Sequence, residues 1–192
     1  MTSRRDAVRA LAGLAALPFF GTLGAQEVLD VGRQAHRLAE LSETGAGPPR
    51  ALTAAEYEMV SQAAERIIPR TATPGATDAR VAGFIDVMLA DWYDEADRAR
   101  FKAGLSELDS RARKRAGRGF ARLPAKQQRE VLETLDRELH AARQARDSRA
   151  DDHWFAMLKH LTIWGYYTSR PGIVEELRVQ LVTGRYDGNA QY

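Results

Sequence analysis

The sequence predicts an all-α fold: a single compact domain of five to seven helices behind an N-terminal export signal. Hydrophobic residues recur every three or four positions in several segments, and glycine- and proline-rich stretches separate those segments. No stretch of useful length alternates between hydrophobic and polar residues as a strand does. The chain has 192 residues, which suffices for one domain with a sizeable core. We therefore expect one helical domain over residues 52–192.

Residues 1–25 have the composition of an export signal. A charged segment that contains Ser3, Arg4, Arg5 and Arg9 precedes an uncharged run that is rich in alanine and glycine. This run is shorter than the roughly 20 residues that span a bilayer. The segment from Ser3 to Arg9 resembles the twin-arginine motif, which directs the export of folded proteins. A general-secretion signal and an uncleaved membrane anchor are the alternatives.

Residues 26–51 are expected to form a poorly defined helix over 27–44 and a Gly/Pro linker over 45–49. The hydrophobic residues available to this helix are Val28, Leu29, Val31, Leu38 and Leu41. The next helix begins at a capping box, in which Thr53 and Glu56 each satisfy a backbone amide. It ends at about Ile68, because Pro69 disfavours helical backbone at the residue before it.

Residues 69–75 contain two prolines and are expected to be non-helical, and the following helix is expected to start at Asp78. The spacing of its hydrophobic residues places one continuous face on Val81, Phe84, Ile85, Met88, Leu89 and Trp92. A further helix is predicted from Asp94, where the helix dipole favours carboxylates. It is expected to bury Phe101, Leu105 and Leu108, to fray over 111–115 and to stop at Gly117.

Two longer helices and one short one are predicted in the remainder of the chain. Pro124 suits the first turn of the first of them, whose hydrophobic stripe is Val131, Leu132, Leu135 and Leu139. Asp151 and Asp152 are expected to open the second, whose stripe is Trp154, Phe155, Leu158 and Leu161. Gly165, Pro171 and Gly172 are expected to interrupt the chain after that stripe, and residues 173–182 to form the short last helix.

The residues do not assemble into a recognisable catalytic or metal-binding motif. The chain has no cysteine, which excludes disulfides, thiolate metal sites and thiol nucleophiles. His153 and His160 are seven positions apart, roughly 10 Å along a helix, too far to bind one metal ion. The carboxylates around Asp91 and Asp94 are interpreted as a solvated helix end and the acidic first turn of the next helix. We expect no catalytic residues and no bound cofactor or metal in this chain.

Charge gives no reason to expect nucleic-acid binding. The chain has 28 basic and 26 acidic residues. Residues 1–25 hold three of the basic and one of the acidic residues, so the remainder carries 25 of each and is formally neutral. The basic run from Arg111 to Arg122 is interpreted as a solvated helix end or as a surface that docks onto an acidic partner.

Residues 161–172 are unusually aromatic. Trp164, Tyr166 and Tyr167 occur together, and Ser169 and Arg170 follow directly. Tryptophan, tyrosine and arginine dominate the energetics of protein–protein interfaces. The segment is therefore either part of a partner interface or part of the hydrophobic core.

This aromatic segment and a second motif carry a resemblance to a known family. The second motif is Ile67-Ile68-Pro69-x-x-x-x-Pro74-Gly75-Ala76, and it continues through Val81, Gly83, Phe84, Ile85 and Asp86. With the leader and the C-terminal Gly184-Arg185-Tyr186, these residues resemble the gluconate 2-dehydrogenase subunit 3 family. The resemblance extends from about residue 52 to the C-terminus.

The resemblance implies a non-catalytic small subunit of a periplasmic sugar or sugar-acid dehydrogenase. The large subunit of such enzymes is an FAD flavoprotein of the glucose–methanol–choline type, and a cytochrome c subunit often accompanies it. The resemblance also implies that the small subunit engages the twin-arginine translocon, escorts the large subunit to the periplasmic face of the inner membrane, and meets the membrane only through the complex.

We expect the partner to bind at the two motifs, through Pro69, Pro74, Gly75, Trp164, Tyr166, Tyr167, Ser169 and Arg170. A stand-alone periplasmic structural or binding protein is the alternative, and a metal-dependent enzyme is a more distant one.

Overall fold

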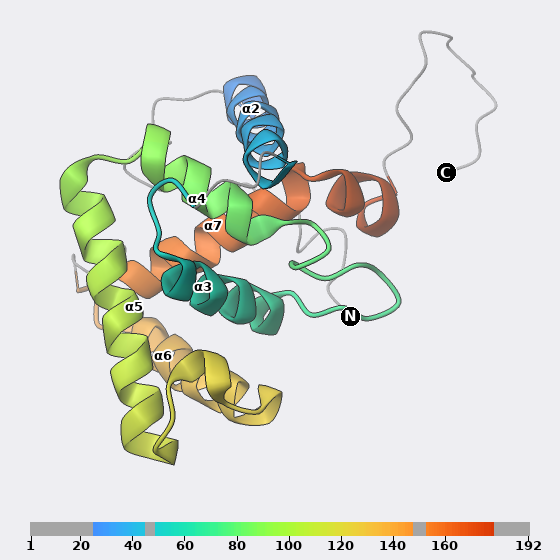
Figure 1. The fold of residues 1–192 in the computed structure, drawn as a ribbon. Coiled ribbons are helices and arrows are strands. Elements are labelled where there is room, and N and C mark those ends of the chain that lie inside the picture. Colours follow the sequence, from blue (N-terminus) through green and yellow to red (C-terminus); the bar gives the residue numbers. More distant parts are fainter. Residues whose placement is uncertain (1–24, 45–48, 148–152, 179–192) are drawn as a thin grey trace, which may run out of the picture.

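The computed structural model describes residues 25–44, 49–147 and 153–178, and these fold into six α-helices and two short helical turns without a strand (Figure 1). The prediction of an all-α fold is confirmed. The elements are α2 (Ala25–Thr44), α3 (Ala54–Ile67), α4 (Val81–Asp91), α5 (Glu95–Ala116), the 3-10 turn η1 (Phe120–Arg122), α6 (Ala125–Gln144), α7 (Trp154–Thr168) and the π-helical turn η2 (Pro171–Glu176).

The predicted export signal, with Ser3, Arg4, Arg5 and Arg9, lies outside the described residues and stays a prediction. The same holds for Asp151 and Asp152. Among the helices that are described, none is both long enough and apolar enough to cross a bilayer.

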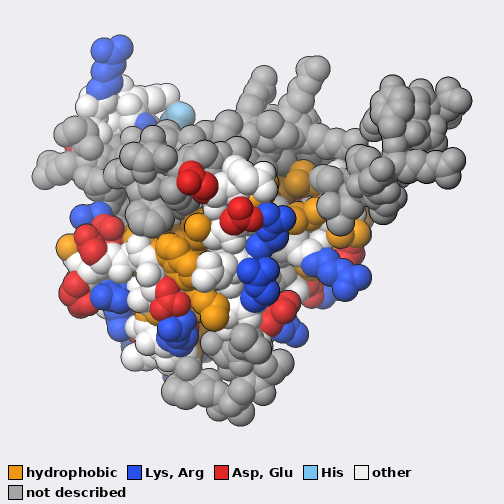
Figure 2. Space-filling view, turned by 90° about the horizontal axis from the view of Figure 1, so that it is seen from above, with side chains coloured by type: hydrophobic (Ala, Val, Ile, Leu, Met, Phe, Trp, Pro, Cys, Tyr) orange, Lys and Arg blue, Asp and Glu red, His pale blue; other side chains and the backbone are white. Residues whose placement is uncertain are grey.

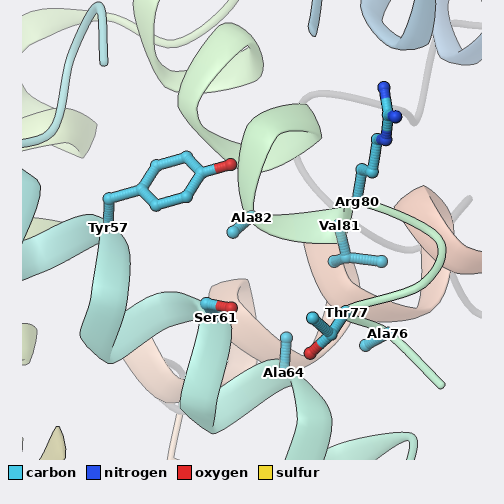
Figure 3. A pocket seen from close by; sticks show the side chains of 8 residues that line it. All are labelled: Tyr57, Ser61, Ala64, Ala76, Thr77, Arg80, Val81 and Ala82. Carbon is cyan, nitrogen blue, oxygen red and sulfur yellow. The ribbon is translucent and has the colours of Figure 1, made fainter. Parts of the chain in front are cut away.

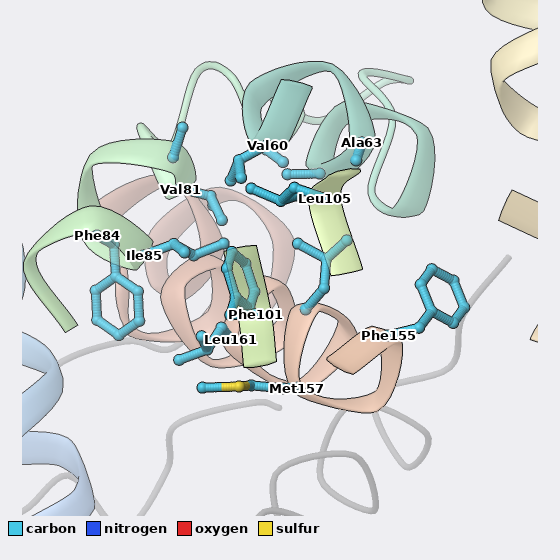
Figure 4. Close-up of a cluster of buried hydrophobic side chains, with 14 of the residues drawn as sticks. Val60, Ala63, Val81, Phe84, Ile85, Phe101, Leu105, Phe155, Met157 and Leu161 are labelled. Atoms are coloured by element: carbon cyan, nitrogen blue, oxygen red, sulfur yellow. The ribbon is translucent and has the colours of Figure 1, made fainter. Parts of the chain in front are cut away.

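Helix α7 is the centre of the fold, because α2, α3, α4, α5 and α6 all contact it. A helix with neighbours on every side must be hydrophobic around most of its circumference, which accounts for the composition of α7. Figure 4 shows the core where α3, α4, α5 and α7 meet, with Ile85, Phe101, Leu105 and Leu161 gathered in the cluster and Phe84 at its side. Each of these five side chains is at most 1% exposed. The hydrophobic stripes predicted for α5 and α7 are confirmed, and so is that of α4 except for Trp92, which follows the end of the helix and is partly buried.

The predicted start of α3 is confirmed. The Thr53 hydroxyl accepts the Glu56 N–H at 3.2 Å, and Glu56 Oε2 accepts the Thr53 N–H at 2.7 Å, so both halves of the capping box are present. The helix ends at Ile67, before Pro69. The acidic start of α5 is confirmed too, because Asp94 Oδ1 accepts the Asp97 N–H at 2.8 Å.

Helix α4 begins at Val81, so the predicted start at Asp78 is wrong. The Asp78 carboxylate does not cap the helix. It accepts the Gly75 N–H at 2.8 Å and also binds the Arg70 guanidinium. Arg80 then enters α4 with a left-handed backbone, φ 54°, which ordinary residues rarely adopt.

Helix α5 continues through Ala116, so the predicted fraying over 111–115 is wrong. Three arginines hold its last turns through ion pairs: Arg111 bridges Glu107 and Glu138, Arg113 binds Asp109, and Arg115 binds Glu130. The helix ends at Gly117, φ 68°, in the left-handed conformation that favours glycine.

The C-terminal part differs from the prediction in two ways. Gly165 lies inside α7 and does not interrupt it. It packs against Phe84 of α4, because a Cβ at Gly165 would lie 2.7 Å from the Phe84 ring. The last helical turn is Pro171–Glu176, whereas the sequence predicts a helix over 173–182. Residues 177 and 178 are already non-helical, and the rest of that range lies outside the described residues.

Helix α2 packs on α4 and α7 through small residues and a histidine, which the sequence prediction missed. On this face Gly32, Ala35 and Ala39 are buried and His36 is half-buried, and a Cβ at Gly32 would lie 2.8 Å from Thr168 Cγ2. Small side chains let the two helices approach closely. Of the larger residues predicted for this helix, Val28, Val31 and Leu38 are partly buried beside this face, and Leu29 is 40% exposed.

His36 joins α2 to α7. Its Nε2–H donates to the Gly165 carbonyl at 2.8 Å and also reaches Thr168 Oγ1 at 3.1 Å, and its ring lies 4.8 Å from the Phe84 ring centroid. Burial lowers the pKa of His36 below its ordinary value of 6.5, although the bond to Gly165 and the charge of Glu40, also on α2, act in the opposite direction.

We expect this histidine to make the fold less stable as the pH falls below about 6.5. In that range the unfolded chain binds a proton that the folded chain resists, so the free energy of unfolding decreases with decreasing pH. Thermal unfolding between pH 7 and 5 measures the effect. His36→Gln keeps a donor but does not titrate, so its melting temperature should vary less steeply with pH. Parallel pH profiles for the two proteins would show that the ring is not resisting protonation.

Candidate partner interface

The first sequence motif forms the loop between α3 and α4, and carboxylates hold this loop from both ends. Glu65 at the end of α3 accepts the N–H groups of Arg70 and Thr77, each at 2.9 Å. Asp78 accepts the Gly75 N–H from the other side. Because each bond has an ionised acceptor, the loop is held more firmly than a turn closed by neutral groups.

The second motif reaches the same loop from the C-terminal part of the chain. The Tyr166 hydroxyl donates to the Pro74 carbonyl at 2.6 Å, and the Thr73 hydroxyl donates to Glu176 Oε2 at 2.6 Å. Burial raises the pKa of Tyr166 to about 12, so its hydroxyl keeps the proton that it donates. The two motifs, far apart in the sequence, therefore form one structural unit.

Two glycines allow this unit to close. A Cβ at Gly75 would lie 2.5 Å from Glu65 Oε1 and 2.6 Å from the Arg70 nitrogen. A Cβ at Gly172 would lie 2.0 Å from the Tyr166 carbonyl oxygen, a backbone atom that has little freedom to move. Both positions exclude a side chain because the backbone approaches its neighbours closely.

Asp86 ends the first motif and is its one buried charged residue, 3% exposed in the middle of α4. Its carboxylate accepts three backbone N–H groups from the segment before α3: Arg50 at 2.7 Å, and Ala51 and Leu52 at 2.9 Å each. The carboxylate thus supplies the acceptors that this non-helical segment lacks.

The structure corrects the expected contact surface. Trp164, Tyr166, Tyr167 and Ser169 are 0%, 1%, 9% and 4% exposed, so they belong to the core of this chain. The Trp164 ring packs edge-on against Phe84, with centroids 5.2 Å apart, because α7 has neighbours on all sides. A side chain without accessible surface cannot meet a partner while the chain is folded.

The other predicted contact residues divide by exposure. Gly75 is buried and Pro74 is half-buried, whereas Pro69 and Arg170 are exposed. Exposure continues along the loop through Arg70, Thr71 and Ala72, and Val174 of η2 is 49% exposed. We call Pro69, Arg70, Thr71, Ala72 and Val174 the loop edge. It is the accessible part of the unit that the buried residues hold in shape.

A cavity of about 300 Å³ lies beside the loop, between α3 and the start of α4 (Figure 3). Small side chains form most of its lining. Aliphatic groups come from Ala64, Ala76, Val81 and Ala82, and hydroxyls come from Ser61 and Thr77. The Tyr57 ring points across the cavity toward α4, whereas the Arg80 side chain points away from it. These walls hold no carboxylate and no histidine, so the cavity suits a side chain of a partner better than acid–base chemistry.

Figure 2 shows the face of the molecule that carries α2 and α4. Hydrophobic side chains form small patches there, and basic and acidic side chains are interspersed around them. Such a pattern is typical of an ordinary solvated surface.

Sequence reasoning missed the residues that support the loop and the segment before α3. The sequence did indicate the role of Asp86, because a single carboxylate inside the hydrophobic run of α4 requires buried donors. Glu65, Asp78 and Glu176 had none, because they look like the acidic residues of any helix end. His153, whose spacing from His160 argues against a shared metal ion, has a structural role, because its Nδ1 accepts the Phe155 N–H at 3.1 Å and caps α7.

The profile of the family named gluconate 2-dehydrogenase subunit 3 matches residues 54–184, more than half of the chain. The chain belongs to this family. The matched range runs from the start of α3 past η2. It therefore includes the loop between α3 and α4, Asp86 and the central helix α7, whereas α2 lies outside it. No match was found among the curated proteins or among the solved structures.

The name of the gluconate 2-dehydrogenase subunit 3 family places its members in a dehydrogenase of several subunits. The predicted resemblance is confirmed on the two motifs that carried it. The expected ending at Gly184 to Tyr186 lies at and beyond the limit of the match and outside the described residues.

Proposed function

We propose that this chain is a non-catalytic accessory subunit that binds the FAD-containing large subunit of a sugar or sugar-acid dehydrogenase through the loop edge. The proposal rests on one observation: the two family motifs pack together into one structural unit. Three carboxylates, two buried glycines and the Tyr166 hydroxyl hold a short exposed loop in one shape. A rigid surface loses little conformational entropy when a partner binds, which favours recognition.

The same contacts argue against catalysis by this unit. Glu65, Asp78 and Asp86 all accept backbone N–H groups. A carboxylate that satisfies backbone donors serves the fold, and a general acid or base needs access to a substrate proton. We therefore assign the redox chemistry, and the FAD, to the partner subunit.

The export role rests on the leader. A folded subunit with a twin-arginine signal can take a bound large subunit through the translocon. This places the complex at the periplasmic face of the inner membrane, where a cytochrome c subunit is a further candidate partner. The neutral charge of residues 26–192 agrees with recruitment by a specific surface instead of a general field.

Binding through the loop edge is tested by Ala72→Arg on a tagged copy expressed with its large subunit. The tagged wild-type chain should retain an FAD flavoprotein, and the variant should retain at least tenfold less, because a bulky cation in a complementary interface costs more than about 1.4 kcal/mol. Ala141→Arg on α6 is the matched control, since both alanines are exposed. Unchanged helicity and melting temperature establish that both variants fold. Equal retention by all three proteins would refute the loop edge as the binding site.

The escort role is tested by replacing both Arg4 and Arg5 with Lys. Lysine keeps the charge of the leader, so a general-secretion signal would still work, whereas a twin-arginine signal would not. We expect this chain and the flavoprotein to stay in the cytoplasm together, measured by cell fractionation and FAD fluorescence. A flavoprotein that reaches the periplasm in active form without this chain would contradict the escort role.

A further inference from the structure

Basic residues are concentrated at one end of the molecule, where α5 ends and α6 begins. Residues 113–129 contain seven basic residues and no acidic one, and all seven side chains are exposed. We call this group the basic tip: Arg113, Lys114, Arg115, Arg118, Arg122, Lys126 and Arg129. Asp109 pairs with Arg113, and Glu130 pairs with Arg115, so these two carboxylates leave five cations in excess.

The basic tip has a defined shape. Gly117 ends α5 with a left-handed backbone, and the Phe120 N–H donates to Asp109 Oδ1 at 2.8 Å. The Phe120 carbonyl accepts a bond from Gln128 Nε2 at 3.1 Å, and the Phe120 ring is fully buried. The cations are therefore presented on a fixed turn.

The fold does not need all of this charge. Arg113, Lys114 and Arg115 lie in the last turn of α5, where the helix dipole favours cations. Lys126 lies in the first turn of α6, where the dipole disfavours them, and α6 has no acidic residue in that turn and no side-chain cap. The charge of Arg122 attracts Asp109, the carboxylate that already pairs with Arg113. Lys126 thus opposes the stability of the isolated chain, and the cations of the basic tip outnumber the carboxylates that pair with them. Such an uncompensated cluster is suited to an anionic group outside the chain.

The remaining surface makes the basic tip distinctive. Residues 26–192 are formally neutral, so the excess of positive charge at one end is balanced by acidic residues elsewhere. This separation of charge orients the molecule in front of a negative surface. On the face in Figure 2 the two signs of charge are interspersed. In Figure 1 the end of α5 lies at the bottom of the molecule, away from α2 and η2.

The composition of the basic tip decides between a protein and a lipid surface. Tight protein interfaces need buried aromatic or aliphatic anchors. The large hydrophobic residues that are exposed in the described part of the chain are Leu29 and Val174, and neither belongs to the basic tip. Contact with anionic headgroups needs only clustered cations and no shape complementarity.

We propose that the basic tip binds the surface of a bilayer that contains anionic phospholipid. This inference does not depend on the proposed function, and it gives the chain a membrane contact of its own beside the one expected through the complex. With the tip on the bilayer, the loop edge remains free for the large subunit.

The test is sedimentation of the chain without residues 1–25, bound to its large subunit or alone, with vesicles of phosphatidylcholine or of phosphatidylcholine with about 30% phosphatidylglycerol. We expect binding only to the anionic vesicles, decreasing with salt. The variant R118Q/K126Q/R129Q should bind about a hundredfold more weakly, because each cation near an anionic surface contributes roughly a fivefold factor. The control R37Q/R100Q/R137Q removes three exposed cations elsewhere and should bind as the wild-type chain does.

A second measurement separates this proposal from a structural role of the cations. Because Lys126 opposes the dipole of α6, the tip variant should melt at the same temperature as the wild-type chain or higher. A lower melting temperature, or equal vesicle binding by the two triple variants, would overturn the proposal. So would unchanged vesicle binding with loss of the large subunit, which would make the basic tip a protein contact.

Discussion

Replacing Asp86 with Asn is expected to lower the free energy of unfolding by about 3 kcal/mol, a drop of about 10 °C in melting temperature. The carboxylate is buried and both of its oxygens accept backbone N–H groups, from Arg50, Ala51 and Leu52. An asparagine has one acceptor oxygen, and its NH2 group would face a donor. At least one buried N–H group then loses its acceptor. The remaining bonds also lose the negative charge that strengthens them.

Asp91→Asn is the matched control, because it also removes one carboxylate charge from α4 and also concerns Arg50. Asp91 binds the Arg50 guanidinium through both oxygens, at 2.6 and 2.8 Å, but the two side chains are 29% and 41% exposed. A solvated ion pair contributes no more than about 1 kcal/mol. Thermal and urea unfolding of the two variants should differ clearly. Similar losses would mean that Asp86 is no more important than a surface carboxylate.

Gly104→Ala is expected to destabilise the chain by about 3 kcal/mol, although alanine is the better helix former. Gly104 lies in the middle of α5, where the first residue of α7 crosses it. An alanine Cβ would lie 2.1 Å from Trp154 Cγ and 2.7 Å from Trp154 Cβ. The tryptophan would have to leave its place, and with it the bond from Trp154 Nε1 to Glu107 Oε2 at 3.0 Å.

Gly117→Ala provides the comparison for this variant. Nothing lies within 4 Å of a Cβ at Gly117, so the cost there comes only from its left-handed backbone and should be about 1 kcal/mol. Urea unfolding gives both free energies, and tryptophan fluorescence should change only in Gly104→Ala. A stabilised Gly104→Ala would show that local helix propensity outweighs the contact with Trp154.

Much of the secondary structure was predictable because its causes are local. The start of α3 depends on Thr53 and Glu56, which are three positions apart, and its end depends on the proline that follows. The start of α5 depends in the same way on Asp94. The hydrophobic stripe of α4 needs only the helical repeat. In each case the residues that decide the conformation lie within one or two turns of one another.

The site was predicted as two motifs, but the role of each residue within them was not. A rich aromatic segment has the composition of an interface and of a core alike. Asp78 was expected to start a helix, since acidic residues are enriched in the first turn before a hydrophobic run. It binds the loop instead, because the loop folds back and brings Gly75 and Arg70 to the carboxylate.

The sequence alone determined the class of fold, the helices with local start and stop residues, the neutral charge of residues 26–192 and the family of the chain. Only the tertiary structure decided that Trp164, Tyr166 and Tyr167 belong to the core. It also decided that Gly104 and Gly165 lie where two helices cross, and that α2 packs on α7 through Gly32 and His36. The reason is physical. Helix formation depends on neighbours a few positions away, whereas burial depends on which distant element lies opposite, and that is settled when all the helices pack together.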